Sequence, residues 1–353
     1  MSDLSCLCGL ELVSPGQSKS PGAVIRSSTS ALRPRGGHYG DPERVLILGH
    51  EFVRNGVCKM KLFSSALLAA SLMVAPAAFA QGLPAASSAT IPLKGVGFFG
   101  ATANMEAEVF KPAGAGPFPV MVYAHGRSGT PQERLALREV IPRQYLEFWV
   151  ARGFAAVGVA RPGYGRTGGI DREIPGHTWE SSGRCAGSFN PDRVADAAGA
   201  AIVATIDWVR QQAWAKAGAV VVTGNSVGGM TAVLVGSRAP EGVLGVINFA
   251  GGVGGNPSLA PGRSCSPEKL TALFGKLGAS SRLPSLWLYA PNDLFWGPEI
   301  PKTWYAAFTD AGAQASALTM TSPLPSPDGH DLIFVGRALW EPHVDGFLKN
   351  LGL

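Results

Sequence analysis

One five-residue segment, Gly224-Asn225-Ser226-Val227-Gly228, strongly limits how this chain can fold. It follows a β-branched run at 219–223 and precedes an apolar segment with helical spacing. A serine flanked by glycines at such a junction is typical of a tight strand-to-helix turn, because small neighbours let the backbone bend sharply. We therefore expect Ser226 to stand on a turn above the end of a strand, with its hydroxyl exposed.

Strand-like and helix-like segments alternate along most of the chain. Short apolar runs that end at Gly, Asn or Asp predict buried strands. The clearest helix begins at Asn190-Pro191-Asp192, where Asn can cap the helix and Pro can take its first position. Such alternation predicts an α/β fold with a mostly parallel sheet and helices on both faces. The predicted strands are Met105–Phe110, Pro119–Ala124, Ala155–Ala160, Ala219–Thr223, Val243–Phe249, Leu286–Tyr289 and Ala317–Met320, and the other predicted helices lie around 132–152, 229–238, 298–311 and 337–349.

Composition favours one globular domain over residues 81–353. Hydrophobic residues make up 46% of the chain and charged residues 16%, which suits a well-buried enzyme and argues against widespread disorder. This region contains no internal repeat and no low-complexity linker. We expect its first ten residues, 81–90, to form a leader of small residues ahead of the domain.

The segment at 60–80 resembles a secretory signal peptide. Lys59 and Lys61 form a positive end, an apolar run follows, and Ala78-Phe79-Ala80 fits a cleavage site ahead of Gln81. A retained membrane anchor is the alternative. Because signal peptides stand at the start of a chain, we expect residues 1–59 to be a disordered upstream extension that is not native to the protein. The predicted location is therefore periplasmic or secreted.

Export also changes what the charges and the cysteines imply. The formal net charge is +5, but residues 1–80 hold eight Lys/Arg and five Asp/Glu, so the remainder is near +2 and predicts no nucleic-acid partner. Cys6, Cys8 and Cys58 precede the cleavage site, which leaves Cys185 and Cys265. In an oxidising compartment these two can form a disulfide, with two separate thiols as the alternative.

A serine nucleophile needs a base, which a carboxylate must orient. Chains with this kind of turn carry the three residues in the order serine, acid, histidine. Two histidines follow Ser226: His330 in a loop, and His343 in a helical segment, where a structural role is expected. We predict His330 as the base and Asp293, directly after a predicted strand, as the acid. The alternative acids are Asp328, Asp331 and Glu299.

Two backbone amides are candidates for binding the negative oxygen of the reaction intermediate. The Val227 N–H lies at the start of the helix that follows Ser226. The Arg127 N–H lies in His125-Gly126-Arg127-Ser128-Gly129, directly after a predicted strand. We expect His125 to be structural, because it precedes the nucleophile in chain order.

Residues 125–129, 224–229, Asp293 and His330 resemble the α/β-hydrolase superfamily, in particular its dienelactone-hydrolase-like and small esterase members. The resemblance covers nearly all of residues 92–353. It implies an eight-stranded, mostly parallel sheet, a triad at Ser226, Asp293 and His330, and hydrolysis of an ester or lactone through an acyl-enzyme. Dienelactone hydrolases themselves use a cysteine nucleophile, so their substrate does not carry over to Ser226.

The substrate is left open. Aromatic residues that follow strand ends either line the cleft or pack loops onto the core. Arginines in the same segments either favour an anionic ester or are solvated at the surface, and solvation is the more common explanation. We predict a small-molecule ester substrate, no cofactor and no metal, with a serine peptidase, an acyltransferase or a catalytically silent binding protein as alternatives. The aromatic candidates are Tyr164, Trp179, Phe295 and Trp296, and the arginines are Arg127, Arg161, Arg166 and Arg184.

Overall fold

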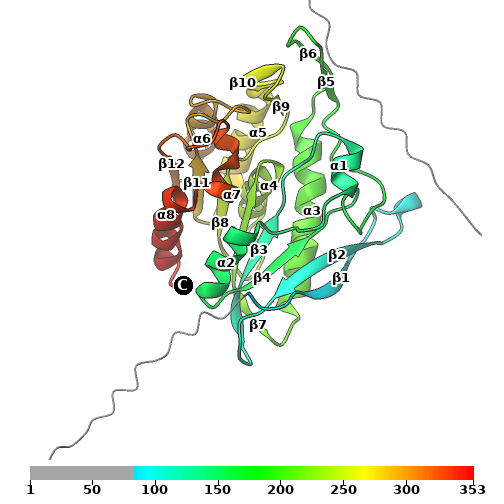
Figure 1. Ribbon diagram of the computed structural model, residues 1–353, viewed down its shortest axis with the longest axis vertical. Coiled ribbons are helices and arrows are strands. Elements are labelled where there is room, and N and C mark those ends of the chain that lie inside the picture. Colours follow the sequence, from blue (N-terminus) through cyan, green and yellow to red (C-terminus); the bar gives the residue numbers. More distant parts are fainter. Residues whose placement is uncertain (1–82) are drawn as a thin grey trace, which may run out of the picture. The chain divides into compact units, whose positions relative to one another are not determined.

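The computed structural model describes residues 83–353, which are organised around one central sheet (Figure 1). The predicted extension at 1–59 and the predicted signal peptide at 60–80 lie outside the described residues. The strands are β1 (Ser87–Leu93), β2 (Ala103–Phe110), β3 (Phe118–Ala124), β4 (Ala155–Val159), β5 (His177–Trp179), β6 (Cys185–Gly187), β7 (Ala215–Asn225), β8 (Val243–Phe249), β9 (Gly255–Asn256), β10 (Ala260–Ser264), β11 (Ser285–Tyr289) and β12 (Ser316–Met320). The α-helices are α1 (Pro131–Leu135), α2 (Arg143–Ala151), α3 (Pro191–Arg210), α4 (Val227–Arg238), α5 (Pro267–Ser280), α6 (Ile300–Asp310), α7 (Leu332–Val335) and α8 (Arg337–Asn350), with short 3-10 turns at Phe98–Gly100 and Gly329–Asp331.

Within the described residues, the main sheet has eight strands in the order β1-β2-β4-β3-β7-β8-β11-β12. The six strands from β4 to β12 pair in parallel, whereas β1 and β2 are antiparallel to their neighbours. The carboxyl ends of the parallel strands therefore meet at one edge, where such sheets bind ligands. The predicted eight-stranded, mostly parallel sheet is confirmed.

Helices cover both faces of this sheet because the buried residues of its central strands alternate in direction. Met121 and Tyr123 of β3 pack against α2, α7 and α8, whereas Val120 and Val122 pack against α3 and α4. The helices α5 and α6 extend the second layer through a third apolar cluster that contains Trp287. The prediction of helices on both faces is confirmed.

The predicted start of α3 and most predicted strands match the structure closely. Asn190 caps α3 by accepting a hydrogen bond from the Arg193 amide (2.9 Å), and Pro191 takes the first helical position. The prediction for β8 is correct at both ends. Strand β7 is longer than predicted at both ends, because residues 216–218 are exposed and carry no apolar signal and the strand continues through Gly224 and Asn225.

Two local predictions are wrong, and one helix was missed. The predicted helix at 132–152 is two helices, because Pro142 starts α2 and cannot continue a helix from before it. The predicted leader at 81–90 enters β1 at Ser87, a strand whose outward positions are small and polar. Helix α5 was not predicted, although Leu270, Leu273, Phe274 and Leu277 have the required spacing.

Two hairpins, β5–β6 and β9–β10, lie beyond the carboxyl ends of the parallel strands (Figure 1). A disulfide joins Cys185 of β6 to Cys265, which follows β10, with the two Cα atoms 5.3 Å apart. The predicted pairing is therefore present. Arg263 adds a second link, because it donates to the Gly183 carbonyl (2.6 Å) and lies over the Trp179 ring.

We expect replacement of both Cys185 and Cys265 by serine to lower the free energy of unfolding by about 2–4 kcal/mol. The bond links residues 80 positions apart, so its loss frees a long loop of the unfolded chain. Urea unfolding followed by circular dichroism measures the effect. A reductant should destabilise the wild type and leave the double variant unchanged, and equal unfolding midpoints for the two proteins would contradict the prediction.

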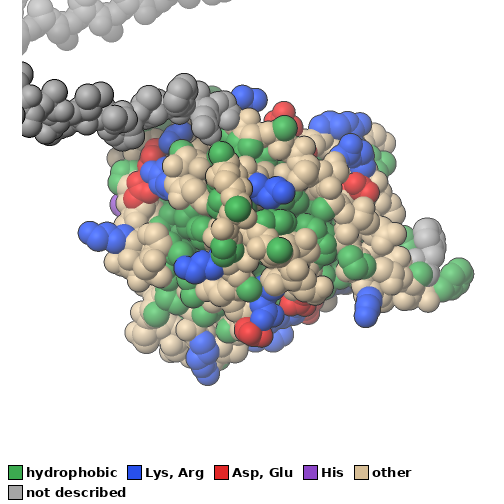
Figure 2. Space-filling view, turned by 90° about the horizontal axis from the view of Figure 1, so that it is seen from below, with side chains coloured by type: hydrophobic (Ala, Val, Ile, Leu, Met, Phe, Trp, Pro, Cys, Tyr) green, Lys and Arg blue, Asp and Glu red, His purple; other side chains and the backbone are tan. Residues whose placement is uncertain are grey.

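Within residues 83–353, no helix is long and apolar enough to cross a membrane. Figure 2 shows the end of the molecule away from the two hairpins. Its Lys and Arg side chains lie at several places among apolar and other side chains, some of them next to Asp or Glu.

Candidate active site

Ser226 lies on the turn between β7 and α4, as predicted, with φ 55° and ψ −124°. This conformation is sparsely populated for a residue with a side chain, so the surrounding structure must hold it. The Ser226 amide donates to the Phe249 carbonyl (2.9 Å), and the Ser226 carbonyl accepts from the Met230 and Gly252 amides. The side chain is half-buried and lines a cavity.

The glycines around Ser226 allow close approach of two backbone segments. A Cβ on Gly224 or on Gly228 would collide with the backbone of Ala124 at the end of β3. The end of β3 therefore packs directly on the turn. This contact brings the loop that follows β3 next to Ser226.

His330 and Asp293 come together at the carboxyl ends of β11 and β12. The His330 Nδ1–H donates to Asp293 Oδ2 across 3.0 Å. The Asp293 side chain is fully buried, and its other oxygen accepts from the amides of Phe295 (2.7 Å) and Trp296 (3.1 Å). This hydrogen bond holds the ring with Nε2 free to accept a proton.

Neighbouring side chains fix the two loops that carry this pair. The His330 ring stacks on Phe295, with centroids 4.0 Å apart. Asp328 accepts hydrogen bonds from the amides of His330 and Leu294, both at 2.9 Å. The Asn292 amide group donates to the Leu324 and Ser326 carbonyls and so ties the loop after β11 to the loop before His330. Sequence analysis did not identify this role of Asn292.

Ser226 and His330 line the same cavity of about 550 Å³. The described hydrogen bonds do not include one between these two side chains, a bond that often tightens only when substrate is bound. A second cavity, of about 840 Å³, begins at Ser226 and extends towards the two hairpins. The two cavities share Arg127, Ser128 and Phe295, so Ser226 is accessible from two sides.

The loop after β3 lies against the Ser226 turn. A Cβ on Gly126 would lie 3.2 Å from the side-chain Nδ2 of Asn225 and 3.4 Å from the Ser226 Cβ. The hydrogen bonds of the described residues include none from the backbone amides of Arg127 or Val227, the two predicted oxyanion donors. Both amides belong to segments that border Ser226.

The four aromatic candidates differ in exposure. Phe295 lines both cavities, whereas Trp179, on β5, lines only the larger one. Trp296 is 1% exposed and donates to the Ala250 carbonyl (2.7 Å), so it forms part of the cavity floor. Tyr164 is equally buried, and its hydroxyl donates to Glu173 (3.0 Å).

The arginine candidates also differ in how far they are exposed. Arg184 is exposed and pairs with Glu180, but Arg161 is completely buried and pairs with Glu173, so surface solvation is the wrong explanation for Arg161. Arg127 forms two hydrogen bonds with Asp171, at 2.7 and 3.0 Å. Burial alone would raise the pKa of Asp171, but the Arg127 guanidinium outweighs burial and lowers that pKa.

Asp171 and Glu173 are the main residues that sequence analysis missed. Their spacing of two would place both carboxylates on one side of an extended segment, which is a readable signal. The positions of their partners, Arg127 and Arg161, were not readable because they depend on tertiary structure.

We expect the buried His125 to make stability depend on pH. Burial lowers its pKa well below the ordinary value, and the Arg161 guanidinium lowers it further. In the unfolded chain the ring gains a proton near pH 6.5, whereas in the folded protein it stays neutral. The free energy of unfolding should therefore have its full value above about pH 6.5. Below that pH it should fall by up to about 1.4 kcal/mol per pH unit.

Urea unfolding at several values between pH 7 and about pH 5 measures this slope. His177, whose pKa burial and Arg127 also lower, contributes with the same sign. The His125→Asn variant cannot gain a proton at this position, so its slope should be shallower. Identical slopes for the variant and the wild type would show that His125 does not contribute.

Among residues 83–353, no group of three or more His, Cys, Asp or Glu side chains is placed to hold a metal ion. A sequence model of the X-Pro dipeptidyl-peptidase family (S15) matches residues 100–285. This range contains the Ser226 turn and the loop after β3 and ends before Asp293 and His330. No curated protein sequence matches the chain significantly.

Several solved structures resemble the described domain. An esterase from Pyrococcus furiosus has a TM-score of 0.50 at 12% identity, over 76% of this chain and 92% of the esterase. A protein described as a dienelactone hydrolase, from Klebsiella pneumoniae, has a TM-score of 0.46 at 16% identity, over 76% and 98% of the two chains. An acylaminoacyl peptidase from Pyrococcus horikoshii has a TM-score of 0.47 at 13% identity, over 76% and 42%. At such identities, the likeness to the esterase indicates a shared fold and not a shared substrate.

Proposed function

The chain belongs to the X-Pro dipeptidyl-peptidase (S15) family and is a hydrolase of the α/β-hydrolase superfamily, and we propose that it cleaves a carboxylic ester or lactone through an acyl-enzyme on Ser226. One observation carries the proposal. Ser226, held in a strained turn, shares a cavity with His330, whose Nδ1–H donates to the buried Asp293. Strain is retained at a turn where function requires it.

In the first half-reaction, Ser226 Oγ attacks the carbonyl carbon of the ester. His330 Nε2 takes the hydroxyl proton, and Asp293 stabilises the imidazolium that forms. The carbonyl oxygen becomes an oxyanion and accepts hydrogen bonds from the Val227 and Arg127 amides. Collapse of this intermediate expels the alcohol, which receives the proton from His330 and leaves the acyl group on Ser226.

Water completes the reaction in the second half. A water molecule gives its proton to His330 Nε2 and attacks the acyl carbon, and a second oxyanion forms between the same two amides. Ser226 then leaves with the proton held by His330, and the carboxylic acid is released.

The S15 family match favours peptide-bond hydrolysis as a second candidate. A dipeptidyl-peptidase substrate carries a free α-ammonium group, which an unpaired carboxylate would bind. Of the carboxylates that line the two cavities, Asp171 is paired with Arg127 and Arg134, and Glu133 caps α1. The remaining one, Glu139, is exposed. Glu139 forms no ion pair among the described residues and is therefore the carboxylate that a dipeptide substrate would use, so the ester and anilide rates below separate the two candidates.

A fluorophosphonate probe followed by peptide mass spectrometry tests the nucleophile, and we expect the label on Ser226. A series of p-nitrophenyl esters from acetate to octanoate, compared with Xaa-Pro p-nitroanilides, then tests the substrate class. A higher kcat/KM on an ester supports the proposal. A higher kcat/KM on the anilides would instead support the second candidate, a peptidase. A folded protein that does not label at Ser226 would refute the covalent mechanism.

We also propose that the enzyme works in the periplasm or outside the cell. The Cys185–Cys265 disulfide supports this location, because such bonds persist in oxidising compartments. Fractionation of the native organism, with N-terminal sequencing of the mature chain, tests it. A mature chain that begins at Gln81 would agree, and one that begins near Met1 would contradict it.

A further inference from the structure

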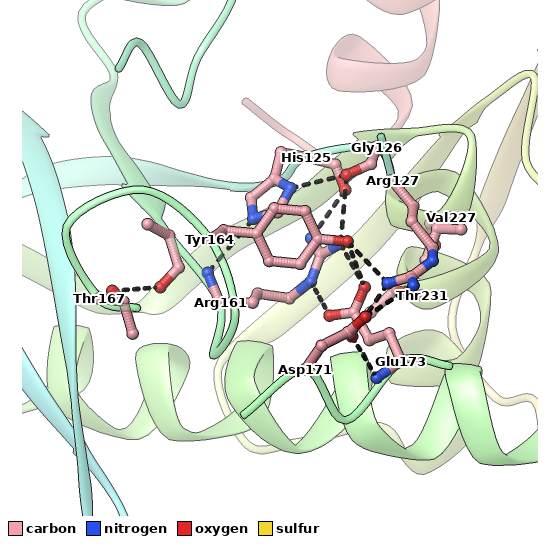
Figure 3. Close-up of polar contacts among 11 residues, drawn as sticks. His125, Gly126, Arg127, Arg161, Tyr164, Thr167, Asp171, Glu173, Val227 and Thr231 are labelled. Atoms are coloured by element: carbon pink, nitrogen blue, oxygen red, sulfur yellow. Dashed lines mark hydrogen bonds and ion pairs between the residues drawn. The ribbon is translucent and has the colours of Figure 1, made fainter. Parts of the chain in front are cut away.

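The loop that carries Arg127 is held from behind by the segment after β4 (Figure 3). Arg161, two residues past β4, points its guanidinium at this loop. Its Nη1 donates to the His125 carbonyl (2.7 Å) and its Nη2 lies 3.4 Å from the Gly126 carbonyl. Arg161 therefore holds the loop through hydrogen bonds to its carbonyl oxygens.

The His125 side chain also contacts the Gly126 carbonyl. Its Nδ1 lies 2.7 Å from the Gly126 oxygen, and its Nε2 lies 3.2 Å from the Arg161 amide. Because a carbonyl can only accept and an amide N–H can only donate, the proton is on Nδ1 and Nε2 is the acceptor. The Tyr164 ring meets the imidazole edge-on, with centroids 4.4 Å apart, and keeps it in place.

These contacts determine where the Arg127 amide points. The Gly126 C=O and the Arg127 N–H belong to one planar trans peptide, in which the two bonds point in opposite directions. Donors that hold the Gly126 oxygen on the far side therefore aim the Arg127 N–H towards the near side. Gly126 packs against the Ser226 turn, and from this contact we infer that the near side of the peptide faces Ser226.

Glu173 pairs with the buried Arg161 guanidinium that binds the loop carbonyls. Its carboxylate accepts from Arg161 Nε and Nη2, and the two side chains are 0% and 2% exposed. Burial alone would lower the pKa of Arg161, but the attraction of Glu173 outweighs burial and raises that pKa. A buried ion pair contributes little net stability compared with apolar residues of the same size, so stability alone is a weak reason for its presence.

We propose that Arg161, His125 and Glu173 are positioning residues that orient the Gly126–Arg127 peptide so that the Arg127 N–H can bind the oxyanion formed at Ser226. The inference rests on the proposed function, since it assigns how one half of that oxyanion site is built. Preorganised donors of this kind stabilise the transition state without rearranging during the reaction. The Arg127 side chain, bound to Asp171 and Tyr164, restrains the other end of the same peptide.

The Arg161→Lys variant tests the inference. Lysine keeps the charge next to Glu173 but lacks the planar fork that reaches two carbonyls and a carboxylate together. We expect kcat on p-nitrophenyl acetate to fall by about 10- to 100-fold, with KM little changed, because loss of one oxyanion donor costs about 100-fold or more. The Ki of a trifluoromethyl ketone, whose adduct places an oxyanion in the same position, should rise by a similar factor.

A pair of variants at His125 provides a readout that a structural role would not give. In His125→Asn the amide nitrogen replaces Nδ1 and can still donate to the Gly126 carbonyl, whereas His125→Phe removes the donor. We expect His125→Asn to keep a clearly higher kcat than His125→Phe. Equal kcat values in the two variants would overturn the inference, even if Arg161→Lys proves unable to fold.

Thr167→Val is the matched control. Thr167 lies in the same segment but bonds to the Ala160 carbonyl and the Glu106 amide, away from the loop after β3 (Figure 3). Its loss should lower the melting temperature and leave kcat and Ki unchanged. A folded Arg161→Lys protein with wild-type kcat, or with reduced kcat but unchanged Ki, would refute the positioning role. Absence of fluorophosphonate label on wild-type Ser226 would instead refute the proposed function itself.

Discussion

Ser226→Ala is expected to lower kcat on p-nitrophenyl esters by about 10⁴- to 10⁶-fold while the protein stays folded. The substitution removes the proposed nucleophile and nothing else, because the described hydrogen bonds include none from the Ser226 side chain. The remaining rate would come from the oxyanion amides and from substrate binding. Steady-state kinetics and the loss of fluorophosphonate labelling measure the effect.

Ser226→Gly is the matched variant for the strain at this turn. Both substitutions remove the nucleophile, but only glycine adopts a positive φ without cost. We expect Ser226→Gly to be more stable than Ser226→Ala by about 1 kcal/mol in urea unfolding, and equally inactive. Substantial activity in either variant would assign the reaction to another nucleophile.

Asp293→Asn should have the second largest effect, a fall in kcat of about 10⁴-fold. The asparagine oxygen can still accept from the Phe295 and Trp296 amides, which places its NH₂ group opposite His330 Nδ1. That NH₂ group donates, so Nδ1 must become the acceptor and the proton moves to Nε2. A ring with its proton on Nε2 cannot accept the proton of Ser226.

Asp328→Asn is the control for this prediction. Asp328 uses one oxygen to accept from the amides of Leu294 and His330, and asparagine retains that oxygen. We expect kcat to stay close to that of the wild type. If Asp328→Asn lost as much activity as Asp293→Asn, then Asp328 and not Asp293 would orient the base.

Much of the candidate site could be predicted because each part follows a strand end. Apolar runs marked β7 and β11, and in a parallel sheet their carboxyl ends lie at one edge. Ser226 and Asp293 were therefore expected near each other although they are far apart in the sequence. The structure places Asp293 against His330, and the catalytic roles of all three residues stay predictions until the variants are measured.

The supporting contacts could not be predicted in the same way. Arg161 carries no sign in the sequence that distinguishes a buried ion pair from a solvated charge, and its partner Glu173 lies in an irregular segment. The pairing requires the segment after β4 to fold back under the loop after β3. The helix and strand propensities of individual residues do not show that one segment folds back under another.

Sequence alone determined the alternation of strands and helices, the parallel sheet and the turn at Ser226, because these depend on apolar periodicity and on the small size of glycine. Tertiary structure decided which charges are buried and which amides face the nucleophile. The orientation of the Gly126–Arg127 peptide depends in part on Arg161, which reaches the loop after β3 from the segment after β4. Contacts of this kind exist only once the sheet has brought those segments together.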